Sequence, residues 1–337
     1  MIPKRPVLLV NPHAGPARAR GRIPHLERAF LAAFPQGRIL LSSPGAADLR
    51  ESDLLVVYGG DGTLARLLSL PLSPDLPVLL LPGGTGNVLS RYLAVPFDPA
   101  RPGEIFSRLG RARPLAFSPG MADSVRFCLM AGAGWDGVAA QRVRGKRRLG
   151  PLSYYLAGLA ATFSGNLPRI SLKIQGNEGR VIVREGIVWA LISRLPPYFG
   201  PFRVAGAGAM AETPFMVTLV RDSGLRVPGA FLEMLPGGPS GIFSERLPAR
   251  EVELCSGSLP QPCDSPGRST DRVPCQADGE AIPSFSRVRL SPETLALLSF
   301  RASDSGIDDP GRVPDLPDLS RFFSPFTLLW HFFLKKL

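Results

Sequence analysis

Three short apolar runs, each followed by a glycine-bearing turn and then a helical pattern, organise the first 95 residues of the chain. The runs are Pro6–Val10, Asp53–Tyr58 and Pro77–Leu81. Near-continuous apolar runs of this length are typical of parallel strands that are covered on both faces. The pattern therefore predicts an α/β domain with a parallel-type sheet, whose ligand would lie at the carboxyl ends of the strands, beside the glycine turns.

From about residue 116 the pattern changes to alternating, turn-punctuated segments, which predict antiparallel strands. We place the boundary near Pro114. The expected fold is α/β plus β: an α/β domain over residues 1–115, a mainly antiparallel β-sandwich over 116–296, and a linker with an amphipathic aromatic tail over 297–337. The strands expected in the second domain include Arg126–Met130, Arg169–Ile174, Val181–Ile192, Phe215–Val220 and Val288–Leu290.

The composition excludes several classes of protein. Of 337 residues, 45% are hydrophobic and 20% are charged, so the chain can build real cores. No stretch approaches the roughly 18 uninterrupted apolar residues that a membrane-spanning helix needs. The four cysteines form no C-x-x-C pair, and the start resembles no secretory leader, so we expect a reduced, cytoplasmic protein.

The charge balance favours an anionic partner, because the net charge is +11 at pH 7. Nucleic acid, membrane headgroups and phosphorylated metabolites all fit this balance. Nucleic-acid binding has only the charge in its favour, since the sequence carries no recognisable nucleic-acid-binding motif, and we expect none.

The first candidate site is the turn GGDGT, residues 59–63, which lies between an expected strand and an expected helix. Its glycines allow positive φ angles and close approach of a ligand, while Thr63 can cap a helix whose free N–H groups attract phosphate. Asp61 would repel phosphate unless it held Mg²⁺ or faced the group that receives the phosphate. The turn therefore predicts an anion site, and an ordinary tight turn is the alternative.

Two further turns repeat this design. One strand later, residues 82–87 read PGGTGN, and the first strand is followed by NPHAG at residues 11–15. Two neighbouring glycine turns of this kind could bind one polyphosphate between them. The pair is more specific evidence than a lone G-x-G-x-x-G match.

Five motifs in this order resemble the diacylglycerol kinase catalytic family, most of all its soluble bacterial lipid kinases. They are NPHAG, GGDGT, LPGGTGN, AGAGWDG and DGE, and the resemblance runs from about residue 5 to residue 291. Sphingosine and ceramide kinases are related to this family, and NAD kinases are more distant relatives. The resemblance implies an ATP-binding α/β domain, a β-sandwich lipid domain, and an active site in the cleft between the two domains.

The resemblance also implies roles for individual residues. Glu280 matches the family's general base, Asp278 would orient it, and Asp61 would organise the catalytic Mg²⁺ or the acceptor. Phosphoryl transfer consists mainly of positioning and charge neutralisation, so few parts are required. The residues expected to bind ATP are Asn11, Pro12, His13, Ala14, Gly15, Ser42, Gly59, Gly60, Asp61, Gly62, Thr63, Gly84, Thr85 and Asn87.

The sequence departs from the family pattern at several positions. Ala14 stands where the family often has a hydroxyl residue. Glu212 stands where the family usually has the Asp of a structural Mg²⁺ site. The family's nucleotide-contacting threonine after the second strand corresponds to Ser42 or to Ser43, because the loop is shorter here.

We therefore predict an ATP- and Mg²⁺-dependent lipid kinase that phosphorylates a lipid hydroxyl, with diacylglycerol giving phosphatidic acid as the leading reaction. Its partner would be a lipid at the anionic inner face of the membrane. The basic run 142–148 would contact that surface, and the alternative is a merely solvated segment. The aromatic tail 324–337 would also contact it, and the alternative is docking onto the protein's own surface. An NAD kinase, a catalytically inactive membrane-binding module and a homodimer stay open.

Overall fold

The structure is a computed structural model of the whole chain. It describes residues 3–300 except 42–43, 69, 71, 144–156, 159, 163–166, 177–178, 199–201, 205–214, 222–225, 236, 257–272 and 292–293. Four expectations therefore fall outside the described residues: those on Ser42, on Glu212, on the tail, and on the basic run beyond Val143.

Six strands form the first sheet, sheet A, in the order β2-β1-β3-β4-β17-β5. Neighbours from β2 to β17 pair in parallel, and β5 pairs with β17 in the antiparallel direction. Every residue of β1 and β3 is buried, as expected for strands that are covered on both faces. The strands are β1 (Pro6–Val10), β2 (Arg38–Leu41), β3 (Leu54–Gly59), β4 (Pro77–Pro82), β5 (Arg113–Phe117) and β17 (Leu295–Ser299).

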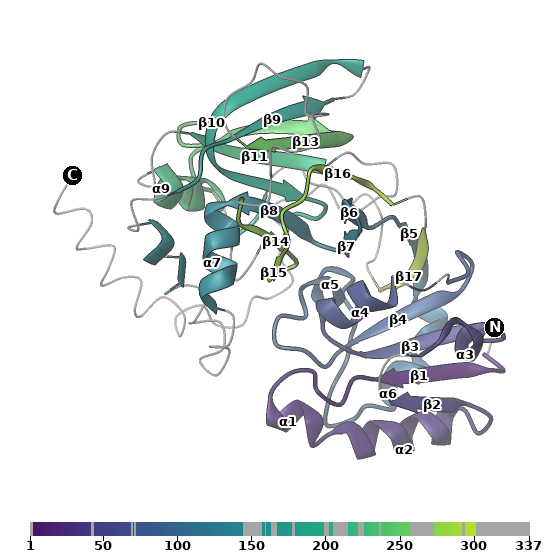
Figure 1. The fold of residues 1–337 in the computed structure, drawn as a ribbon. Coiled ribbons are helices and arrows are strands. Elements are labelled where there is room, and N and C mark those ends of the chain that lie inside the picture. Colours follow the sequence, from purple (N-terminus) through teal and green to yellow (C-terminus); the bar gives the residue numbers. More distant parts are fainter. Residues whose placement is uncertain are drawn as a thin grey trace. The chain divides into compact units, whose positions relative to one another are not determined.

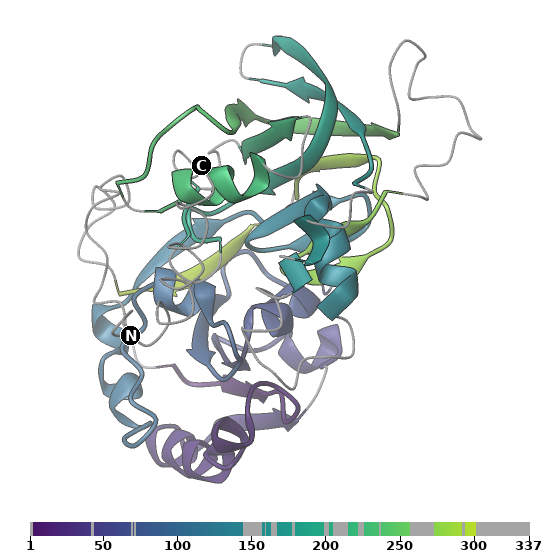
Figure 2. The ribbon, with the colours of Figure 1, turned by 90° about the vertical axis from the view of Figure 1, so that its left-hand side faces the viewer.

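Helices cover both faces of sheet A (Figures 1 and 2). Because side chains alternate along a strand, Leu8 and Val10 pack with α2 and α6, whereas Val7 and Leu9 pack on the side of α4 and α5. None of the helices in the described part of the chain is long and apolar enough to cross a membrane. The helices are α1 (Ala17–Arg20), α2 (Ile23–Ala33), α3 (Ala46–Leu49), α4 (Asp61–Leu67), α5 (Val88–Tyr92) and α6 (Glu104–Ser107), followed by a 3₁₀ turn at Leu109–Arg111.

Eleven strands form the second sheet, sheet B, and every pairing described between them is antiparallel. Phe127 and Phe215 come from strands far apart in the order of the sheet, yet their ring centroids lie 6.0 Å apart. Sheet B is therefore one sheet that curls around its own core rather than two stacked layers. Its strands are β6 (Gly120–Ala122), β7 (Val125–Phe127), β8 (Met130–Gly134), β9 (Ile170–Gln175), β10 (Val181–Ser193), β11 (Phe215–Arg221), β12 (Glu245–Ala249), β13 (Glu251–Ser256), β14 (Cys275–Ala277), β15 (Glu280–Ile282) and β16 (Arg287–Leu290).

Two helices accompany sheet B, α7 (Trp135–Val143) and α9 (Arg226–Glu233). The predicted fold class, an α/β part followed by a mainly antiparallel β part, is confirmed, with the correction that the β part is one curled sheet where a β-sandwich was predicted. The strand predicted over Arg126–Met130 is wrong, because the chain forms β7 and β8 there with a break between them. The break occurs where the backbone N–H groups of Cys128 and Leu129 donate to the Asp278 carboxylate instead of to a neighbouring strand.

The chain passes between the two sheets twice, after β5 and before β17. At these crossings the hydroxyls of Ser118 and Thr294 lie 3.1 Å apart. The fully buried Arg194 donates from Nε to the Ser118 carbonyl at 2.8 Å, and burial lowers the pKa of its guanidinium to about 10. The linker expected from residue 297 is corrected at its start, because residues 297–299 belong to β17 of sheet A.

Candidate active site

The three glycine turns that follow β1, β3 and β4 pack backbone against backbone. Gly15 has a φ of 67°, and a Cβ atom there would overlap the carbonyl of Gly83. A Cβ atom on Gly84 would lie 2.5 Å from the Cα of Gly60. Any side chain at these positions would push the turns apart, so glycine is required for the close approach.

Two asparagines hold the turns in shape. Asn11 donates from Nδ2 to the Thr63 hydroxyl at 2.9 Å, which joins the first turn to the second, and its Oδ1 accepts the N–H of His13 at 3.0 Å. Asn87, at a φ of 51°, exchanges two hydrogen bonds of 2.7 Å with the backbone of Gly84. These predicted binding residues therefore all lie at one edge of sheet A.

Asp61 is the first residue of α4, and its carboxylate reaches across to the start of α5. Its two oxygens accept the backbone N–H groups of Val88 at 3.0 Å and Leu89 at 2.9 Å. Burial raises the pKa of the Asp61 carboxyl, while these hydrogen bonds and the charge of Arg91 act in the opposite direction. Asp61 thus caps the next helix, a structural role that the sequence did not predict.

The DGE segment is a tight hairpin. β14 and β15 are joined by Asp278 and Gly279, whose φ angles of 48° and 80° are those of a type I′ turn. The Asp278 carboxylate points away from the turn and accepts the N–H groups of Cys128 at 2.7 Å, Leu129 at 2.7 Å and Met130 at 3.1 Å. It fastens the hairpin to the break between β7 and β8.

Burial raises the pKa of Asp278 to about 6, against the effect of the three N–H donors, and the negative charge of Asp61 adds to the rise. Burial is the main reason that the pKa of the Cys128 thiol is raised, and the charge of Asp61 adds to this rise. In addition, α4 contacts β7. The turn that holds Asp61 and the hairpin that holds Glu280 are therefore neighbours, and the Glu280 side chain is exposed.

Comparisons with known proteins show what the chain resembles. A diacylglycerol kinase of Bacillus subtilis (strain 168) is 32% identical to the chain over 117 residues, which are 34% of this chain and 38% of that protein. The chain thus aligns with little more than a third of that relative's length. Residues 5–117 match the diacylglycerol kinase catalytic domain. We call residues 5–117 the catalytic domain after this similarity, and they hold every strand of sheet A except β17.

Solved structures extend the likeness of fold beyond the catalytic domain. A diacylglycerol kinase from Bacillus anthracis (strain Sterne) is 16% identical with a TM-score of 0.58, and the match covers 89% of this chain and 98% of that one. Two further structures from the same strain have TM-scores of 0.63 and 0.61 at 17% and 19% identity. At these identities the likeness concerns the fold, and it covers sheet B as well as the catalytic domain.

Sequence reasoning missed a group of polar residues behind the hairpin. Asp136, in the first turn of α7, is 6% exposed and accepts hydrogen bonds from the Tyr198 hydroxyl at 2.6 Å and from Gln276 Nε2 at 2.7 Å. Burial raises the pKa of this carboxyl, while the hydrogen bonds from Tyr198 and Gln276, together with the Trp189 side chain, lower it. Asp136 lies in the motif AGAGWDG, and Tyr198 begins a segment that also resembles the family, whereas Gln276 carries no such signal.

The remaining predicted residues are placed as follows. His13 and Thr85 are exposed on their turns, and Pro12 and Ala14 are partly buried. In the part of the chain that the structure describes, no three His, Cys, Asp or Glu side chains gather into a metal site.

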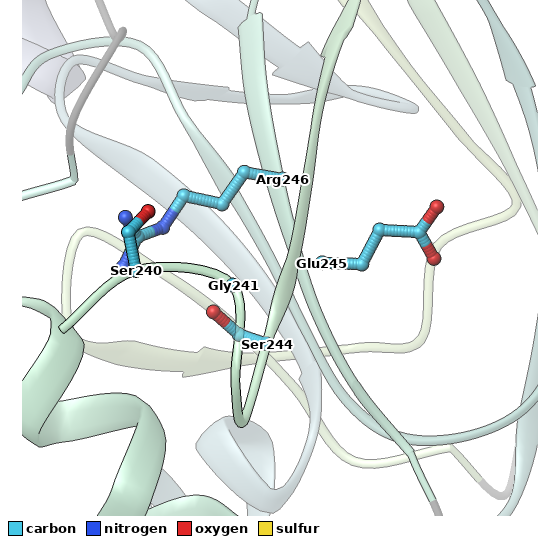
Figure 3. Close-up of a pocket in the computed structure, with 5 residues that line it drawn as sticks. All are labelled: Ser240, Gly241, Ser244, Glu245 and Arg246. Atoms are coloured by element: carbon cyan, nitrogen blue, oxygen red, sulfur yellow. The ribbon is translucent and has the colours of Figure 1, made fainter.

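A pocket of about 330 Å³ lies elsewhere, beside β12 (Figure 3). Ser244 and Arg246 point to one side of the strand, and Glu245 points to the other (Figure 3). The buried Glu233 carboxylate accepts the N–H groups of Ile242 at 2.6 Å and Phe243 at 2.7 Å beside this pocket. These bonds hold the loop before β12, and no predicted site residue lines the pocket.

Proposed function

We propose that the protein is a lipid kinase that uses ATP and Mg²⁺ to phosphorylate a lipid hydroxyl, with diacylglycerol as acceptor and phosphatidic acid as product. The observation that carries the proposal is the meeting of the glycine turns of a diacylglycerol kinase catalytic domain with the hairpin that presents Glu280. A nucleotide site and a carboxylate beside it are the parts that phosphoryl transfer needs.

The glycine turns fit the phosphates of ATP. Gly62 and Gly86 are exposed, and a Cβ atom on Gly62 would have no atom within 4 Å. In the first turn of α4 the N–H of Thr63 donates to the Gly60 carbonyl at 2.9 Å, whereas the N–H of Gly62 precedes the hydrogen bonds of the helix and can point to a ligand. Backbone donors beside open space are what a polyphosphate requires.

Asp61 is the residue that would hold Mg²⁺. Magnesium in phosphoryl-transfer sites is usually bound through one or two carboxylates together with substrate phosphates, which fits a chain whose described residues form no cluster of three ligands. Each carboxylate oxygen of Asp61 has a second lone pair beside its bond to α5. The ion, when bound, neutralises charge on the transferred phosphoryl group.

Glu280 is the proposed general base. Its exposed carboxylate takes the proton from the lipid hydroxyl as the oxygen–phosphorus bond forms and the bond to the ADP oxygen breaks. Because a lipid acceptor resides in a membrane, we place the reaction at the anionic inner face of the bilayer. The net charge of +11 supports attraction to such a surface.

The test is transfer of labelled γ-phosphate from Mg·ATP to micellar diacylglycerol, monoacylglycerol, ceramide or sphingosine, and to NAD in solution. Glu280→Gln should lower turnover by about 100-fold or more, the usual contribution of a general base, and should leave ATP binding intact. The matched control is Glu51→Gln, because Glu51 is exposed and pairs only with the exposed Arg5 among the described contacts.

Three outcomes would overturn the proposal. Product from NAD alone would make the protein an NAD kinase. Measurable ATP binding without product from any acceptor would make it an inactive nucleotide-binding module. Loss of ATP binding in Glu280→Gln would remove that residue from the role of base.

A further inference from the structure

A buried glutamine connects α7 to the hairpin that carries Glu280. Gln276 lies on β14 and is 2% exposed. Its Nε2 donates to Oδ2 of Asp136 at 2.7 Å, and its Oε1 accepts the backbone N–H of Gly279 at 2.8 Å. One side chain thus bridges a helix and the turn residue that precedes Glu280.

The orientation of this amide is fixed by chemistry. An ionised carboxylate only accepts hydrogen bonds and a backbone N–H only donates, so a single orientation of the Gln276 amide satisfies both partners. The other oxygen of Asp136 accepts the Tyr198 hydroxyl at 2.6 Å. The four groups therefore form a continuous, directional series from Tyr198 to Gly279.

Close packing prevents the series from shifting. A Cβ atom on Gly137 would overlap the backbone of Pro274, so α7 lies directly against the chain that enters β14. A Cβ atom on Gly132 would overlap the Asp136 carboxylate, so that carboxylate lies directly on β8. Asp136 is therefore held on two sides. Gln276, bonded to both Asp136 and Gly279, fixes the hairpin relative to Asp136.

We infer that Gln276 is a positioning residue for the proposed lipid kinase reaction. The hairpin turn has only two residues, so the orientation of the Gly279 peptide determines the direction in which β15 and Glu280 leave the turn. By holding the Gly279 N–H, Gln276 fixes the Glu280 carboxylate relative to α7. This inference rests on the proposed role of Glu280.

The decisive substitution is Gln276→Glu, which keeps the size of the side chain. The introduced carboxyl faces the Asp136 carboxylate, and two carboxylates at this distance hold one proton between them up to an unusually high pH. With that proton the introduced group donates to Asp136 and still accepts from Gly279. Without it the two groups repel each other. Tyr198 and Cys275 also face Asp136, and the charge of Asp136 adds to the raised pKa of Cys275.

We expect the ratio of the kcat of Gln276→Glu to the wild-type kcat, taken at each pH, to be near one at low pH. The ratio should fall about 100-fold as the shared proton is lost, because misplacing a catalytic group by roughly 1 Å has a cost of this size. The KM for ATP should stay unchanged, because the glycine turns are not disturbed. The control is Gln175→Glu, the same change at an exposed position of β9, and its ratio should stay near one throughout.

A reversed pair completes the test. In the double variant Asp136→Asn with Gln276→Glu, the asparagine amide donates to the introduced carboxylate, which accepts from Gly279, and the asparagine oxygen accepts from Tyr198. All three bonds of the series are restored without a shared proton, and only the bond between positions 136 and 276 runs in the reverse direction. Hydrogen exchange of the Gly279 amide should then return to the wild-type rate at high pH, where Gln276→Glu alone exchanges faster.

The exchange measurement separates this inference from the proposed function. If the wild type phosphorylates no lipid, the proposed function fails, and the exchange rates still decide whether Gln276 holds the hairpin. The inference would be overturned if the kcat of Gln276→Glu and its Gly279 exchange rate, each divided by the wild-type value at the same pH, did not change with pH. Gly279 exchange in the reversed pair that is as fast as in Gln276→Glu would also overturn it. Thermal unfolding of both variants shows independently whether fast exchange comes from a general loss of folding.

Discussion

Replacing Asp278 with asparagine should remove a loss of stability that the wild type undergoes as the pH rises from about 4 to about 7, because asparagine keeps the shape of the carboxyl and does not titrate. The native carboxylate is surrounded by the N–H groups of Cys128, Leu129 and Met130. The asparagine oxygen can keep the bonds from Leu129 and Met130, while its amide group, which only donates, leaves the N–H of Cys128 without an acceptor. The variant therefore carries a fixed cost for this lost bond, and it does not titrate.

The magnitude follows from the pKa. Burial first, and the Asp61 charge in addition, raise the pKa of Asp278 from 3.8 to about 6. An acid whose pKa is higher in the folded state contributes stability that is complete below the unfolded pKa and is lost as the pH rises through the folded pKa. At about 1.36 kcal/mol per unit, the wild type loses about 3 kcal/mol from this group between about pH 4 and pH 6. The variant has no such loss.

The assay is urea unfolding of both proteins from about pH 4 to pH 7.5 at constant ionic strength in EDTA, without nucleotide, so that only protonation changes. The cost of the lost Cys128 bond is the same at every pH, so the difference in the free energy of unfolding between the variant and the wild type should shift by about 3 kcal/mol in favour of the variant across this range. A difference that does not change with pH would refute the reasoning. A shift in favour of the wild type would mean that the three N–H donors outweigh burial and hold the pKa low.

Two further substitutions test the packing of the turns and the loop before β12. Gly84→Ala should lower the free energy of unfolding by about 1–3 kcal/mol and weaken ATP binding, because its Cβ would lie 2.5 Å from the Cα of Gly60. The control is Gly110→Ala, whose Cβ meets nothing within 4 Å and should change neither quantity. Calorimetry measures the stability, and nucleotide titration measures the binding. Burial alone would raise the pKa of Glu233, but the hydrogen bonds that it accepts from Phe243, Ser244 and Ile242 lower the pKa below its ordinary value. The contribution of Glu233 to stability is therefore lost as the pH falls. Glu233→Gln should therefore cost about 1–3 kcal/mol at neutral pH and less in acid, with phosphate transfer unchanged.

The catalytic domain could be predicted well because its signals are local. Buried parallel strands must be apolar along their whole length, and the runs that became β1, β3 and β4 satisfy this requirement without interruption. β17 was missed because Leu295–Ser299 finds its partners, β4 and β5, far back in the sequence. No local pattern specifies such a pairing. The break between β7 and β8 was missed for the same reason, because it depends on Asp278, which is far along the sequence.

The candidate site divides along the same line. Glycines that permit close backbone approach are readable from the sequence, and Gly15, Gly60 and Gly84 lie where such a reading places them. The direction of a carboxylate is not readable. Asp61 and Asp278 look like catalytic groups in their motifs, but each binds backbone N–H groups of a segment distant in sequence. Which donors surround a carboxylate depends on packing that only the folded chain defines.

The three carboxylates of the two motifs therefore separate by their surroundings. Asp61 and Asp278 are occupied by backbone donors and hold one element against another, whereas Glu280 is exposed at the start of β15. A group that accepts a proton from a substrate must be reachable, and a group that determines its position must not move. Asp278 fastens the hairpin to the break before β8, and Gln276 fastens it to α7. Two anchors on different elements restrict the movement of the turn, so the exposed Glu280 can be placed accurately without itself being buried.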